Sequence, residues 1–93
     1  MIIKSMKISM HIPWAQSLKD KRMVVKSLTA KTKERFNISV AEVEHQDVLK
    51  TAVIAFVCVA GDTAQADSIL DHVFCYIENH SEADIAHVEY DAH

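Results

Sequence analysis

Residues 51–60 read TAVIAFVCVA, and this stretch decides the fold class. Successive side chains of a strand point to opposite faces of a sheet. One face of this segment carries Ile54, Phe56 and Cys58. The other face carries a row of valines, Val53, Val57 and Val59. A strand that is apolar on both faces belongs in the middle of a sheet, so we predict that 51–60 is a central strand.

The segments around this strand carry alternating strand and helix patterns. Met6, Ile8, Met10 and Ile12 recur with period two, which predicts a half-buried strand that ends at Pro13. Ser17, followed three residues later by Asp20, resembles a capping box and begins a helix that runs to about Phe36. The remaining expected elements are a strand from Ile38 to Glu44 with a β-bulge between Val40 and Val43, a helix capped by Asp62 or Thr63 that runs to about Asn79, and a strand from Ile85 to Tyr90.

This order of elements, βαββαβ, restricts the fold. Each strand–helix–strand unit contributes two parallel strands. These two strands are not neighbours in the sheet, because a strand of the other unit lies between them. Interleaving the units gives an α+β, ferredoxin-like sandwich, a four-stranded antiparallel sheet with two helices on one face. With 93 residues, the chain is expected to form one such domain over residues 1–93.

Composition narrows the function classes. No apolar run is long enough to span a bilayer, and residues 1–4 lack the apolar core of a signal peptide, so we expect a cytoplasmic protein with no membrane partner. The two cysteines, Cys58 and Cys75, lack CxxC spacing and are expected to be buried free thiols. The six histidines form no helical i, i+4 pair, and the chain has a single glycine, so we expect no metal and no cofactor.

The charge of the chain is unevenly distributed. Residues 17–35 carry seven basic and two acidic side chains, a net +5, whereas the rest of the chain carries −8. On a helix, four of the basic residues fall within about 60° of one another. These are Lys19, Arg22, Lys26 and Lys33. Such a stripe predicts contact with the phosphates of RNA. The alternatives are a solvated helix face, or ion pairs with the acidic residues of the second helix, Asp67, Asp71 and Glu78.

Four short runs also occur together in this order: His11-Ile12-Pro13, Ser17-Leu18-Lys19-Asp20-Lys21-Arg22, residues 36–43 (FNISVAEV) and His45-Gln46-Asp47. This combination resembles the YlxP-like family of small bacterial proteins, a domain family of unknown function. The resemblance covers essentially the whole chain. It implies a ferredoxin-like fold, genes that often neighbour those of translation-initiation and ribosome-maturation factors, and no established activity. Relatives often carry Trp and Gln at the positions where this chain has Leu49 and Lys50.

Two further groups of residues are candidates for function. The valine row, Val53, Val57 and Val59, lies on the face of the sheet opposite the helices if the register is as predicted, and we expect it to form a homodimer interface. The alternative is that the register is reversed and these residues form the core. Trp14, His45, Gln46 and Asp47 lie in loops: the aromatic is a partner anchor or a lid over the helix end, and the other three are an acid–base site or local backbone caps.

These observations lead to three hypotheses in order. The first is a non-enzymatic accessory protein that associates with RNA or a ribonucleoprotein through the basic helix. The second is a homodimeric protein-interaction module with no nucleic-acid role. The third is a small enzyme that uses His45 and Asp47, which is the least favoured because no nucleophile or oxyanion donor accompanies them.

Overall fold

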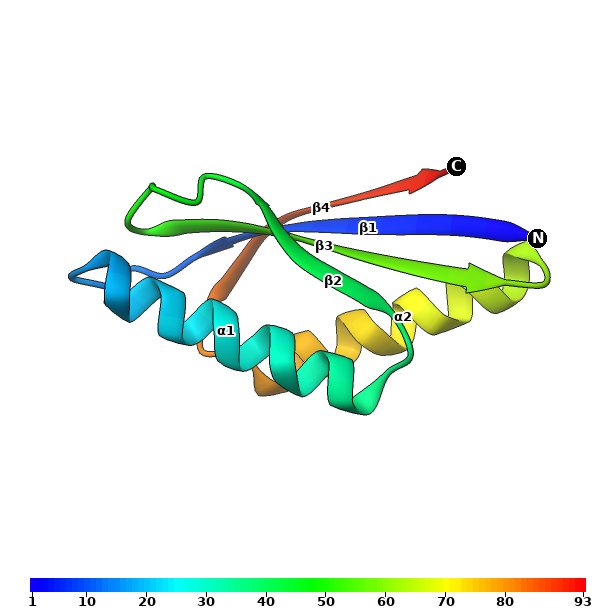
Figure 1. Ribbon diagram of the computed structural model, residues 1–93, viewed down its shortest axis with the longest axis horizontal. Coiled ribbons are helices and arrows are strands. Elements are labelled where there is room, and N and C mark those ends of the chain that lie inside the picture. Colours follow the sequence, from blue (N-terminus) through cyan, green and yellow to red (C-terminus); the bar gives the residue numbers. More distant parts are fainter.

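Six elements follow one another in the order βαββαβ in the computed structural model, which describes residues 1–93 (Figure 1). They are β1 (Ile2–His11), α1 (Leu18–Arg35), β2 (Ser39–Glu44), β3 (Thr51–Ala60), α2 (Thr63–His80) and β4 (Asp84–Ala92). The type and order of every element agree with the prediction, and β3 has the predicted bounds. The first and last strands are longer than predicted, because they pair with each other over polar positions that show no apolar alternation.

The four strands form one antiparallel sheet in the order β2-β3-β1-β4. Both helices lie against the same face of this sheet (Figure 1). This arrangement confirms the α+β, ferredoxin-like sandwich. The predicted bulge in β2 is present, and it falls between Glu42 and Glu44, where the pairing with β3 shifts register. A second irregularity, between Ser9 and Met10, interrupts the pairing of β1 with β4.

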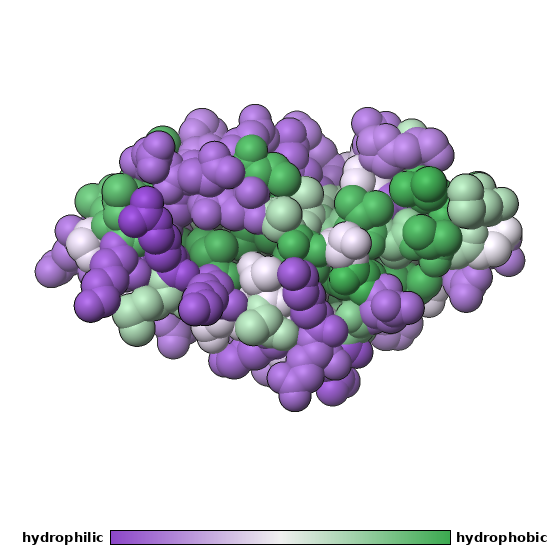
Figure 2. All heavy atoms as spheres, in the orientation of Figure 1, coloured by the Kyte–Doolittle hydropathy of each residue, from purple (hydrophilic) through white to green (hydrophobic).

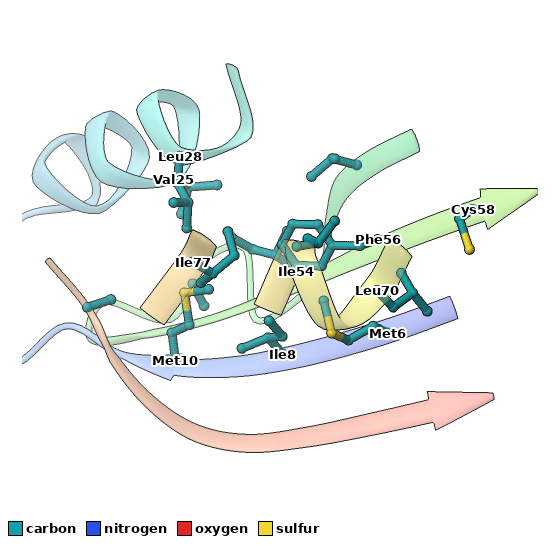
Figure 3. Packing of buried hydrophobic residues seen from close by; sticks show 14 of the residues in the cluster. Met6, Ile8, Met10, Val25, Leu28, Ile54, Phe56, Cys58, Leu70 and Ile77 are labelled. Carbon is teal, nitrogen blue, oxygen red and sulfur yellow. The ribbon is translucent and has the colours of Figure 1, made fainter. Parts of the chain in front are cut away.

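The core lies between the sheet and the two helices. On β1, Met6, Ile8 and Met10 are fully buried, and they pair across the sheet with Phe56, Ile54 and Ala52 of β3. Figure 3 shows the methionine and isoleucine side chains of β1, with Ile54 and Phe56 of β3, pointing toward the helices. Val25 and Leu28 of α1 and Leu70 and Ile77 of α2 meet them there. The register therefore excludes the alternative in which the valine row of β3 forms the main core.

Both helices begin at side-chain caps. The Ser17 hydroxyl accepts a hydrogen bond from the Asp20 amide at 3.1 Å, and the Asp20 carboxylate accepts one from the Gln16 amide at 3.0 Å. In α2, the Asp62 carboxylate accepts from the Gln65 amide at 2.8 Å. Caps of this kind contribute about 1 kcal/mol each, and the cap at Ser17 fixes where α1 begins.

The molecule is elongated, with dimensions of 42 × 21 × 17 Å. Neither helix is long and apolar enough to cross a membrane.

Candidate functional site

The basic stripe of α1, defined as Lys19, Arg22, Lys26 and Lys33, lies on the surface. All four side chains are exposed, and none of them lines the space between α1 and α2. The buried residues of α1 follow a different phase, at Lys21, Val25, Leu28 and Thr32. The stripe is therefore a single charged edge of the helix, separate from both the core and the neighbouring helix.

Few acidic groups neutralise this stripe. Only Arg22 has an acidic partner, and its guanidinium lies 3.7 Å from a carboxylate oxygen of Asp47, with both side chains well exposed. Exposed pairs of this kind contribute about 0–1 kcal/mol. In α2, Asp67 pairs with Lys4 of β1, and no ion pair joins α1 to α2. The alternative in which Asp67, Asp71 and Glu78 neutralise the stripe is therefore wrong.

Lys21 is the unexpected residue of α1, because its side chain is completely buried. Its ammonium group donates hydrogen bonds to the carbonyl oxygens of His45 and Val48, the latter at 2.8 Å. It also lies 3.1 Å from Oε2 of Glu42, on β2. This oxygen is buried and accepts no hydrogen bond from another protein group, so the ion pair with Lys21 is what compensates its charge.

The loop between β2 and β3 is organised around this ammonium group. His45 adopts a left-handed backbone conformation, with φ at 58°, and its carbonyl also accepts a hydrogen bond from the Val48 amide at 3.0 Å. Left-handed geometry is uncommon for residues other than glycine. The hydrogen bonds of Lys21 therefore hold the turn at His45, with its uncommon backbone conformation, against the first turn of α1.

Lys50, which directly precedes β3, attaches this loop to the segment before α1. Its ammonium group donates to the carbonyl oxygens of Pro13, at 2.5 Å, and Ala15, at 3.0 Å. The backbone carbonyl of Lys50 accepts from the Ile12 amide at 2.8 Å. The loop that precedes β3 is thus attached to the first turn of α1 by Lys21 and to the loop that precedes α1 by Lys50.

The predicted loop residues do not form one site. His45, Gln46 and Asp47 are exposed, and no hydrogen bond joins the His45 ring to Asp47. The interactions of this trio are structural: the His45 carbonyl holds Lys21, Asp47 faces Arg22, and the Gln46 amide donates to the Glu42 carbonyl at 3.5 Å. The acid–base arrangement required by the enzyme hypothesis is therefore not formed.

Trp14 lies on the other side of α1. Its side chain is 47 % exposed and lines a hollow of about 270 Å³ between α1 and α2, together with Met23, Val24 and Leu28. Lys31 and His80 also border this hollow. In the view of Figure 2, hydrophobic residues form a broken band along the long axis of the molecule, bordered by hydrophilic residues. Trp14 thus covers part of the gap between the helices, and it does not belong to the basic stripe.

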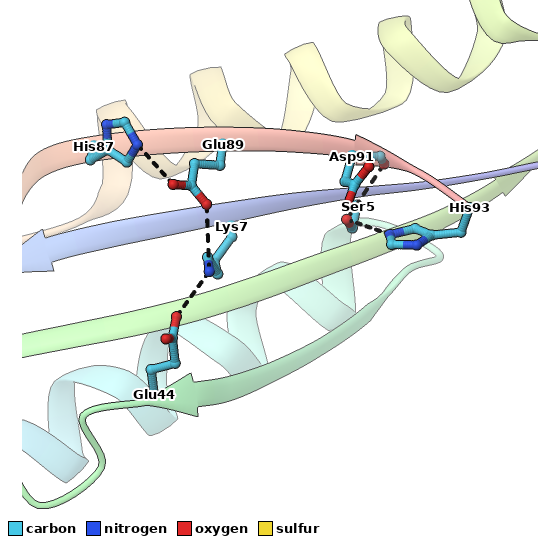
Figure 4. A network of polar contacts seen from close by, with 7 residues as sticks. All are labelled: Ser5, Lys7, Glu44, His87, Glu89, Asp91 and His93. Atoms are coloured by element: carbon cyan, nitrogen blue, oxygen red, sulfur yellow. Dashed lines mark hydrogen bonds and ion pairs between the residues drawn. The ribbon is translucent and has the colours of Figure 1, made fainter.

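The face of the sheet opposite the helices is more polar than the valine row suggested. Lys7 of β1 reaches Glu44 of β2 at 3.0 Å and Glu89 of β4 at 3.5 Å, and His87 donates to Glu89 at 3.2 Å (Figure 4). The hydrogen bond to Glu44 is the main cause that raises the pKa of Lys7. The hydrogen bond from His87, followed by the charge of Lys7, lowers the pKa of Glu89.

This polar network changes the candidate dimer surface. The ion pair between Lys7 and Glu44 crosses β3, and Val53, which pairs with Glu44, is only 3 % exposed. Val53 is therefore unavailable to a partner, and its inclusion in the interface was wrong. Val57 is half-buried and Val59 is 64 % exposed, so an apolar surface remains at the far end of the strand.

The thiol and imidazole groups of the chain do not gather into a site. Cys58 is buried and Cys75 is exposed, so the prediction of burial holds for only one of the two, and both are free thiols. No group of three His, Cys, Asp or Glu side chains lies close enough together to hold a metal ion. The row of cations on α1 is a group of exposed charges of the kind that contacts phosphates.

Comparison with known proteins gives a consistent result. A family described as "Protein of unknown function (DUF503)" matches residues 3–90. The chain is also 29 % identical, over 68 residues, to a protein of Bacillus subtilis (strain 168) described as "Uncharacterized protein YlxP", and this match covers 73 % of the chain and 74 % of that relative. The resemblance drawn from the four sequence runs is thus confirmed, and the chain belongs to the DUF503 family of proteins of unknown function.

Proposed function

We propose that this protein is a non-enzymatic, cytoplasmic accessory factor that associates with RNA or a ribonucleoprotein through Lys19, Arg22, Lys26 and Lys33. The observation that carries the proposal is that the stripe is exposed and that Lys19, Lys26 and Lys33 have no acidic partner. Unpaired lysines in a row release counterions from a phosphate backbone when they bind it, which favours association.

The uneven charge of the molecule favours binding of a polyanion with α1 facing it. The segment 17–35 carries +5 and the rest of the chain −8, so a polyanion is attracted to α1 and repelled by the other surfaces. The role in translation is the most specific part of the proposal. It draws its support from the gene neighbourhood that the family resemblance implies.

Charge reversal tests this proposal directly. We expect Arg22→Glu/Lys26→Glu to lower the affinity for a fluorescein-labelled RNA more than about tenfold in an anisotropy titration at ~50 mM salt. The matched control is the double reversal Lys31→Glu/Arg35→Glu, whose residues lie on the same helix but line the hollows facing α2. If the control loses as much affinity as the double variant, or if no RNA binds at ~50 mM salt, the proposal is wrong.

A pull-down of tagged protein from a cell extract, with and without ribonuclease, tests the same association with cellular RNA. Tagged protein is expected to lose its partners when RNA is digested. Retention of the same protein partners after ribonuclease treatment would support the interaction-module hypothesis instead.

A second candidate function is homodimerisation through the sheet face opposite the helices. It is favoured by the exposure of Val59, whose strand neighbour Val57 is only half-buried. An aliphatic surface of this kind is a common site of self-association. Sedimentation equilibrium at high micromolar concentration is expected to show a dimer that Val59→Asp converts to a monomer. A monomeric parent protein would remove this candidate.

A further inference from the structure

The four residues of the basic stripe follow one another along one edge of α1, and Met23, which is 63 % exposed, borders this edge on the side of the hollow. Lys19 and Lys33 are separated by about 21 Å along α1, at about 1.5 Å of rise per residue. On the same side of the helix, the gap between Lys26 and Lys33 is occupied by Thr29 and Ala30, which have short side chains. The ammonium and guanidinium groups are therefore the most protruding groups of this edge, and a ligand that lies along it meets charges first.

No aromatic side chain belongs to this edge. Trp14, Tyr76 and His80 line the hollows on the side of α1 that faces α2, and Lys31 lies there with them. Lys31 projects about 150° around the helix from the centre of the stripe, at about 100° per residue. Proteins that hold single strands gain about 1–3 kcal/mol for each base stacked on an aromatic ring. The stripe offers no such platform, so phosphate contacts are its main source of affinity.

Phosphate contacts alone favour a double helix over a single strand. A duplex carries one charge for every ~1.7 Å of its axis, about twice the density of either strand alone. Its backbone is also fixed in space, whereas a flexible strand without stacking partners must be ordered on binding. We propose that the basic stripe of α1 binds the sugar–phosphate backbone of a double helix in preference to a single strand, an inference that rests on the RNA association proposed above.

The preference is measurable with three probes of equal length. They are an RNA duplex of about 16 base pairs, the length that domains for double-stranded RNA span, one of its strands alone, and a DNA duplex of the same sequence. Anisotropy titrations between ~50 and ~200 mM salt are expected to show the RNA duplex binding about tenfold or more tightly than the strand. With about four phosphate contacts, the duplex affinity falls about 150-fold over this range, against about 50-fold for a single strand.

Each outcome separates this inference from the proposed function. If none of the probes binds, the RNA association fails. If the single strand binds as tightly as the RNA duplex, or more tightly, the preference for a double helix is overturned while the RNA association stands. Binding to both duplexes alike supports the backbone of a double helix as the ligand and shows that the stripe does not distinguish RNA from DNA. The variants Arg22→Glu/Lys26→Glu and Lys31→Glu/Arg35→Glu are measured with the same duplex, and equal losses would place the site elsewhere.

Discussion

Lys21 and Arg22 are neighbours in the sequence, yet they occupy opposite environments. The Lys21 side chain is 0 % exposed and is held by two carbonyls and Glu42. The Arg22 side chain is 60 % exposed and faces only Asp47, at 3.7 Å. The helix rotates by about 100° between them, which directs the first residue toward the sheet and the second toward solvent.

This difference shows that a run of basic residues does not have one role. The charge of Lys21 is buried inside the protein, where its ammonium group binds the loop between β2 and β3. The others remain available to a ligand. The position of each residue around α1 decides its role, because Lys21 shares the buried face with Val25, Leu28 and Thr32 and Arg22 does not.

Removal of the Lys21 side chain is expected to give the largest change. Lys21→Ala leaves two carbonyls and the buried Oε2 of Glu42, whose side chain is 17 % exposed, without their partner. Loss of one member of a buried ion pair costs about 3–5 kcal/mol, and the partial exposure of Glu42 places the expected loss at the lower end of this range. Urea denaturation followed by circular dichroism measures this loss in the free energy of unfolding. Arg22→Ala is the matched control and is expected to cost less than about 0.5 kcal/mol. Equal stabilities of the two variants would show that the buried contacts of Lys21 have no structural weight.

Lys50 offers a second, smaller test of the same attachment. Lys50→Met keeps most of the aliphatic stem but removes the hydrogen bonds to the Pro13 and Ala15 carbonyls. We expect a loss of about 1–2 kcal/mol, because these carbonyls are near the surface and regain water. The same substitution at Lys26, which has no carbonyl or carboxylate partner, is the comparison in the same denaturation experiment, and it should change stability by less than about 0.5 kcal/mol.

The exposed lysines should show the opposite behaviour. Single substitutions Lys19→Ala, Lys26→Ala and Lys33→Ala are each expected to leave the free energy of unfolding within about 0.5 kcal/mol of the parent. Each should reduce the salt dependence of RNA binding by about one contact. Thermal unfolding and salt-dependent anisotropy give the two readouts. A variant that loses stability but binds RNA as tightly as the parent would show that its lysine stabilises the fold and does not contact RNA.

Lys7 lies between these extremes, because its half-exposed ammonium bridges Glu44 and Glu89. The depressed pKa of Glu89 means that its ion pairs stabilise the folded protein above pH 4.5, and that this contribution is lost as the pH falls through the lower folded-state value. Carboxyl-carbon NMR titration should give a pKa below 4.5 for Glu89. His87→Ala and Lys7→Met are each expected to return it toward its ordinary value. An unshifted pKa in the parent protein would contradict the network.

Much of the fold could be predicted from the sequence because the local patterns agree with one another. The double-faced apolar strand 51–60, the period-two pattern of Met6, Ile8 and Met10, and the cap at Ser17 each define an element by short-range chemistry. The ends of β1 and β4 could not be predicted in this way. Their outer residues, which in β4 are Asp84, Asp91 and Ala92, are held by the backbone of the paired strand, whatever their polarity.

The candidate site was predictable only where it faces solvent. The stripe follows from helix phase alone, whereas the burial of Lys21 depends on acceptors from β2 and the following loop, which the sequence does not place. The sequence does contain one indication that Lys21 is buried, because it shares a helical face with Val25, Leu28 and Thr32. The burial of Val53 has a similar origin, because its cover comes from long side chains on two neighbouring strands.

The most direct test of the division within α1 is chemical-shift mapping of ¹⁵N-labelled protein titrated with an RNA duplex of about 16 base pairs. The shifts are expected to concentrate along the exposed edge of α1, at Lys19, Arg22, Lys26 and Lys33, and to leave the buried ammonium of Lys21 and the face toward α2 unchanged. Shifts centred on the hollow beside Trp14 or on the sheet face that carries Lys7, or the absence of any shift at ~50 mM salt, would contradict the account.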